Sequence, residues 1–110
     1  MDEFIFNITF IIEPAKERDF IDVLRNLFLP KVVNADYGAA NPSLLKVGEV
    51  GGKMPDENHG LSIAFQLGFP NYDLAKEWEK TIFQIALEEL QANYEGELLY
   101  FNTLLQNLSI

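Results

Sequence analysis

The chain has 110 residues, of which 48% are hydrophobic and 13% aromatic, and its net charge is −9. This length predicts one domain spanning residues 1–110, and the apolar content excludes intrinsic disorder. The negative charge disfavours nucleic acid and anionic membranes as partners. The chain has no cysteine, residues 1–13 carry acids where a secretory signal needs bases, and no apolar run approaches the ~20 residues of a membrane span. We therefore expect a cytoplasmic protein without disulfides.

The first predicted element is a strand over residues 3–13, in which large apolar side chains alternate with smaller and partly polar ones. Pro14 fits the first turn of a following helix. From Lys16 the spacing becomes helical, and this helix should end or kink at Leu29-Pro30, because the residue before a proline avoids the helical region. The apolar stripe of the helix is predicted to contain Phe20, Val23, Leu24 and Leu27.

A weaker strand is predicted over residues 44–50, with Gly48 indicating a bulge. An exposed connection over residues 51–60 follows, and then a clearly alternating strand over residues 61–69. Asn71 is the predicted cap of a second helix, which should run to about Tyr94 and stop at Gly96. Its apolar side is predicted to follow one line, with Trp78 as a core residue: Trp78, Ile82, Ile85 and Glu89, flanked by Ala75, Phe83, Ala86 and Leu90. Residues 97–108 are expected to form the last strand.

The order β-α-β-β-α-β predicts a ferredoxin-like α+β fold. Right-handed crossovers place the first and third strands at the centre of an antiparallel sheet, flanked by the fourth and second. Both helices should cover the stripe containing Phe6, Ile8 and Phe65.

The opposite face of this sheet is the only candidate site that the sequence offers. The two central strands put no charged side chain on it, although asparagine, glutamine, serine and threonine lie there together. Of the last strand, Leu99, Phe101 and Leu105 are assigned to the core, and Tyr100, Asn102, Leu104 and Gln106 to this face. The candidate ligand-binding residues are therefore Asn7, Thr9, Ser62, Gln66, Tyr100 and Asn102.

Three interpretations of this face stay open. It could be a monomer surface that is uncovered or crossed by the loop over residues 51–60, an interface between two copies, or a pocket for binding or catalysis. Neutral side chains surrounded by apolar ones favour a second sheet packed over a shallow gap, and symmetric dimers are the commonest assembly. We expect a homodimer through this face.

Other combinations of polar residues predict no chemistry. His59, the single histidine, lies in a predicted turn beside Asp56 and Glu57 without the spacing of a metal loop, so neither a metal nor a cofactor is expected. Glu88 and Glu89 are adjacent on a helix and point about 100° apart, which excludes a shared-proton dyad. No serine has the sequence context of a catalytic nucleophile, and the segment GEVGGK lacks the ending of a phosphate loop.

The element order, the Leu29-Pro30 pair, LLKV at the start of the second strand and FNTLL in the last one resemble a short bacterial family of unknown function. The resemblance covers residues 3–108 and implies a dimeric α+β barrel of ferredoxin-like type without implying a reaction. Members often carry a histidine two residues before the proline, where this chain has Phe28, and the glycine usual a few residues after the proline corresponds at best to Gly38.

Three functional hypotheses follow. The first is a non-enzymatic homodimeric α+β barrel with a structural role or a small apolar ligand. The second is a cofactor-independent oxygenase or isomerase that orients a planar apolar substrate through residues of the candidate cleft. The third, based on net charge alone, is an acidic adaptor for a basic protein.

Overall fold

The computed structural model describes residues 3–47 and 61–108. Four antiparallel strands form one sheet in the order β2-β3-β1-β4. Their bounds are β1 Phe4–Ile12, β2 Ala40–Lys46, β3 Leu61–Phe69 and β4 Leu99–Gln106. This order confirms the ferredoxin-like topology, with the first and third strands at the centre.

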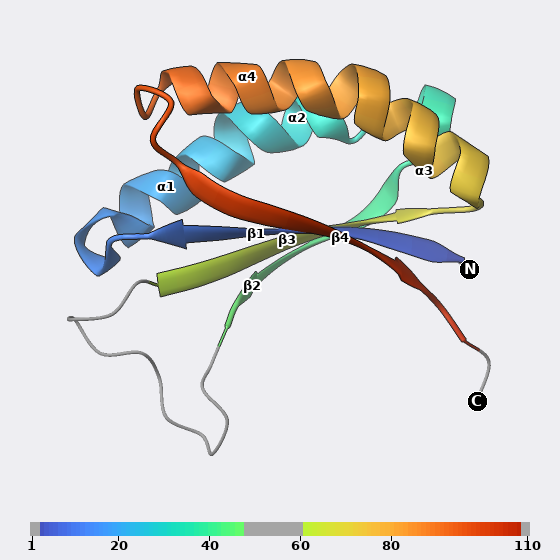
Figure 1. Ribbon diagram of the computed structural model, residues 1–110, viewed down its shortest axis with the longest axis horizontal. Coiled ribbons are helices and arrows are strands. Elements are labelled where there is room, and N and C mark those ends of the chain that lie inside the picture. Colours follow the sequence, from blue (N-terminus) through green and yellow to red (C-terminus); the bar gives the residue numbers. More distant parts are fainter. Residues whose placement is uncertain (1–2, 48–60, 109–110) are drawn as a thin grey trace.

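The helices all lie on one side of the sheet, as Figure 1 shows. The first helical run comprises a 3-10 turn (Pro14–Lys16), α1 (Glu17–Val23), a π-helical turn (Leu24–Phe28) and α2 (Leu29–Val32), followed by a separate 3-10 turn (Ala35–Tyr37). The second run comprises α3 (Tyr72–Trp78), a π-helical turn (Glu79–Phe83) and α4 (Gln84–Ala92). Figure 1 shows no described helix or strand on the other side, which we call the open face. Among the described residues, the helices are too short or too polar to cross a membrane.

The core lies between the helices and the predicted apolar stripe. Trp78, which is 1% exposed, lies at its centre and donates a 2.7 Å hydrogen bond from its indole N–H to the carbonyl of Val32. Its ring centroid is 5.0 Å from that of Phe6, 4.9 Å from that of Phe69 and 5.4 Å from that of Phe83. Trp78 therefore joins two strands to both helical runs, and its assignment to the core is confirmed.

In each helical run the predicted apolar line is buried up to the π-helical turn, as Phe20, Leu24 and Trp78 show, and the burial shifts to neighbouring positions from there on. In the second run, Phe83, Ala86 and Leu90 are buried, whereas Ile85 is 58% exposed. The buried line is thus displaced by one residue after the π-helical turn, because such a turn adds one residue to the helix. The first run shows the same effect: Phe28, the last residue of its π-helical turn, is buried, and Leu27 is 48% exposed.

Pro30 does not end the first helical run, contrary to one of the two expected outcomes. The backbone N–H of Leu29 bonds to the carbonyl of Leu24, five residues back, and the chain stays helical to Val32. Pro30 stands at the start of α2, where a missing N–H is tolerated. The residues just before Leu29-Pro30 form a π-helical turn instead.

The second strand starts earlier than expected, at Ala40, and its bulge lies between Ala40 and Ser43. The expected bulge at Gly48, the connection over residues 51–60 and His59 lie outside the described residues. The helix signals are confirmed: the Asn71 side chain accepts a 2.9 Å hydrogen bond from the N–H of Leu74, and Gly96 has a φ of +76° just beyond α4.

Candidate functional site

The open face carries the predicted residues of the two central strands. Thr9 pairs with Ala64, Asn7 with Gln66 and Ile11 with Ser62 across β1 and β3. Directly paired residues of antiparallel strands project to the same side. Because their neighbours Phe6, Ile8 and Phe10 point into the core, these six residues face away from the helices.

The assignment of the last strand to the two faces is wrong. Tyr100 pairs with Phe10 and Asn102 with Ile8, so both lie on the helix side at the edge of the sheet. Leu104 and Gln106 lie on that side too. The residues of the last strand on the open face are Leu99, Phe101, Thr103 and Leu105. Three of them, Leu99, Phe101 and Leu105, were predicted to lie in the core.

The open face therefore has more apolar surface than predicted. Leu99 and Phe101 are 63% and 53% exposed, and Leu105 and Ile11 are exposed as well. On the other edge, Leu45 pairs with Ala64, and the N–H of Val47 bonds to the carbonyl of Ser62 at 2.9 Å. Exposed large apolar side chains that gather on one face mark interaction sites.

A strip of neutral polar groups crosses the middle of this surface. Gln66 donates a 3.2 Å hydrogen bond from its amide to the side-chain oxygen of Asn7, whose own amide donates a 3.0 Å bond to the hydroxyl of Thr9. We call these three residues the polar strip. Thr9 is only 6% exposed, and Asn7 and Gln66 are half-buried. These hydrogen bonds hold the three side chains in place without a ligand. The amide and hydroxyl groups can still donate and accept further hydrogen bonds with a molecule bound on the open face.

The strands carry no charged side chain on the described open face. Lys46, the one charged residue within the strand bounds, pairs with Ile63 on the helix side and forms a 2.9 Å ion pair with Glu17 of α1. The open face thus has amide and hydroxyl groups for orientation, but no described acid or base for proton transfer at neutral pH.

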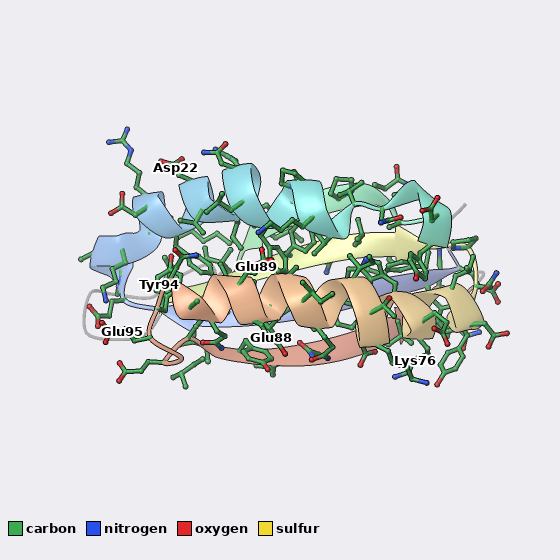
Figure 2. All side chains as sticks on the ribbon, turned by 90° about the horizontal axis from the view of Figure 1, so that it is seen from above. Asp22, Lys76, Glu88, Glu89, Tyr94 and Glu95 are labelled. Carbon is green, nitrogen blue, oxygen red and sulfur yellow. The ribbon has the colours of Figure 1, made fainter. Side chains whose placement is uncertain are left out.

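The shifted pKa values belong to the helical layer. A hydrogen bond from Lys76 to Glu79 and the charge of that carboxylate raise the pKa of the Lys76 ammonium. Burial raises the pKa of the Tyr94 phenol above its ordinary value of 10.0, and the charge of Asp19 adds to the effect. Figure 2 shows Tyr94 at the end of α4, where its ring lies edge-on to that of Phe20, with centroids 5.7 Å apart.

Tyr94 gives the fold a predictable sensitivity to alkali. A raised phenol pKa contributes stability that is present below the unfolded-state pKa and is lost as the pH rises through the folded-state pKa. Urea unfolding from about pH 9 to about pH 11 should show a smaller loss of stability for Tyr94→Phe than for the wild type. Tyr72→Phe, at an exposed ring, is the matched control and should behave as the wild type. Equal losses in all three proteins would contradict the prediction.

The other candidate groups remain apart. Figure 2 shows Glu89 between the two helical runs and Glu88 on the opposite side of α4, which confirms that they form no dyad. Glu89 is half exposed and pairs with Lys31 of α2. Among the described residues, no group of three acids, histidines or cysteines is placed to hold a metal ion.

Sequence reasoning missed Phe101, Leu99 and Leu105 as residues of the open face. The last strand has apolar side chains at both alternations, so its pattern does not reveal which set is buried. Only its pairing with β1 decides this.

The family model that matches residues 3–108 is that of the domain of unknown function DUF4286. The chain belongs to the DUF4286 family. The match spans the whole described sheet and both helical runs. It therefore confirms the resemblance to a family of unknown function, and it assigns no reaction to this DUF4286 chain. Curated proteins include no significant match to it.

Two solved structures are similar in fold to the DUF4286 chain. An ethyl tert-butyl ether D (EthD) family protein from Bacillus halodurans C-125 superposes with a TM-score of 0.67 at 10% identity, covering 96% of this chain and 99% of that one. A de novo designed protein, Foldit4, superposes with a TM-score of 0.55 at 8% identity, covering 96% and 98%. At these identities the likeness concerns the fold alone, and it supports the ferredoxin-like α+β class.

Proposed function

We propose that this protein acts as a cytoplasmic, non-enzymatic homodimer in which the open faces of two copies pack together, with a structural role or a small apolar molecule held between them. The observation that carries the proposal is the uncharged, largely apolar open face around the polar strip. The other broad side of the sheet is already covered by helices, so this face is the surface left for a partner.

The size of the face suits a dimer. β1 and β3 have nine residues each and span about 30 Å, and four strands span about 19 Å across the sheet. The projected area is on the order of 500 Å², and the accessible area of uneven side chains is larger. A standard interface buries about 800 Å² on each partner, so a second sheet of the same size is an adequate occupant.

Charge favours a second copy on this face over any other surface. Each copy carries a net charge of −9, and two such molecules repel each other wherever their acidic surfaces meet. The strands of the open face contribute no charge to that repulsion. A symmetric contact here would keep the acids of both helical layers on the outside of the assembly.

The polar strip supports the non-enzymatic assignment. A cofactor-independent oxygenase or isomerase would need its polar groups around one substrate, but Tyr100 and Asn102 lie on the helix side, away from Asn7, Thr9 and Gln66. The polar groups that remain on the open face are the side chains of the polar strip, which hydrogen-bond to one another. Across a two-fold axis, such a set would pair with its copy and fix the orientation of the two sheets.

The molar mass in solution tests the proposal. Light scattering at micromolar concentration should give the dimer mass for the wild type and the monomer mass for Phe101→Glu, because two carboxylates would then enter the contact. Ile85→Glu is the matched control: Ile85 is as exposed as Phe101 but lies in the helical layer, so this variant should stay dimeric. A monomeric wild type, or two variants with the same mass, would refute the interface.

A further inference from the structure

A separate cavity opens between the first helical run and the edge of the sheet. Its volume is about 120 Å³, and its walls are Leu24 and Leu29 from the helical run, Pro42 and Leu44 from β2, and Phe65 from β3. It lies on the helix side, because Leu44 and Phe65 pair there. It is thus distinct from the open face, and nothing about it rests on the proposed dimer.

Two backbone irregularities meet at this cavity. The π-helical turn Leu24–Phe28 forms one wall, and the bulged part of β2, which contains Pro42, forms the opposite wall. A π turn widens a helix by one residue, and a bulge bends its strand. Both irregularities are associated with functional sites when they occur in helices and sheets.

The rim of the cavity carries one positive charge. Arg25 lines it and is exposed, and in the described part of the chain it takes part in no ion pair. Ser43 also lines the cavity, although its pairing with Gln66 directs its side chain to the open face. The walls are otherwise apolar. A guanidinium fork beside an apolar recess matches a ligand with a carboxylate head and a short hydrocarbon tail.

We propose that this cavity binds short-chain aliphatic monocarboxylates, with the tail against Leu24, Leu44 and Phe65 and the carboxylate on Arg25. The volume limits the tail: a cavity of about 150 Å³ holds one benzene ring, so four or five carbons fill this one. A single arginine favours a carboxylate over a phosphate, whose further oxygens would find no cationic or amide side chain in this lining.

Sodium pentanoate and methyl NMR spectra of the full chain test the proposal. Titration should shift the methyl signals of Leu24, Leu29 and Leu44 in a saturable way, with a dissociation constant on the order of millimolar for so small a ligand. Arg25→Gln should weaken binding by up to about fivefold, because an exposed charge pair worth at most about 1 kcal/mol is lost. 1-Pentanol, which keeps the tail but not the charge, should bind more weakly than pentanoate by a similar factor.

Two further variants make the result specific. Arg18→Gln removes the same charge from the exposed side of α1, away from the cavity, and should bind pentanoate as the wild type does. Leu44→Trp fills the cavity and keeps Arg25, and it should abolish the shifts. The proposal is overturned if pentanoate gives no saturable shifts, if Arg25→Gln binds as tightly as Arg18→Gln, if 1-pentanol matches pentanoate, or if Leu44→Trp still binds. The molar mass is measured on the same samples, so that pentanoate binding and dimerisation are tested independently.

Discussion

Thr9→Arg is expected to convert the proposed homodimer into a monomer, raising the dissociation constant of that dimer by at least ~100-fold. Thr9 lies on central strand β1 between Ala64 and Phe101, in the middle of the open face. In a symmetric contact, an arginine there meets its own copy, and both charges leave water without a partner. An uncompensated buried charge costs about 3–5 kcal/mol. Sedimentation equilibrium at micromolar concentration measures the change.

The matched control is Thr81→Arg, which introduces the same charge in the helical layer and should leave the dimer intact. Thr9→Val is the second control: it removes the hydroxyl that accepts the hydrogen bond from Asn7, but it adds no charge. It should stay dimeric with a modest loss of stability, about 1 kcal/mol. Circular dichroism verifies that each variant is folded. If Thr9→Arg leaves both the mass and the melting temperature unchanged, the interface is wrong.

Trp78→Ala should cause the largest loss of stability in the helical layer, about 3–5 kcal/mol. The substitution removes a buried indole in contact with the rings of Phe6, Phe69 and Phe83, and the core around it closes only partly. For a domain of this size, each kcal/mol lowers the melting temperature by about 4–8 °C. Urea unfolding and thermal scans measure the loss.

Two variants separate packing from hydrogen bonding at this position. Trp78→Phe keeps a ring in the core but leaves the carbonyl of Val32 without the indole donor, and it should cost about 1–3 kcal/mol. Tyr72→Ala removes an aromatic ring that is half exposed and touches only Phe4 among the described rings, so it should cost less than 1.5 kcal/mol, roughly the worth of one such pair. A loss for Trp78→Ala as small as that for Tyr72→Ala would contradict the assigned role of Trp78.

Strong two-residue alternation made the sheet predictable. In strands such as the one that contains Phe6 and Ile8, large apolar side chains occupy one set of positions and smaller or polar ones the other. Shifting such a strand by one residue would expose all its aromatic side chains, so only one orientation is stable. The two central strands, the helix-covered stripe and four of the six candidate site residues follow from this pattern alone.

The last strand and the helices lacked such a unique pattern. Phe101 and Tyr100 are both compatible with burial, and pairing with β1 placed Phe101 on the open face. In the helices, the one-residue insertions at the π-helical turns exchanged Ile85 for Ala86 and Leu27 for Phe28 on the buried side.

The sequence by itself thus determined the fold class, the strand order and the position of the polar strip, because these depend on local alternation and on the chirality of the connections. The tertiary structure decided which side chains surround that strip and where the cavity lies. Both depend on register between segments far apart in the chain, and a shift of one residue in register costs little in local energy yet reverses which side chains meet the core.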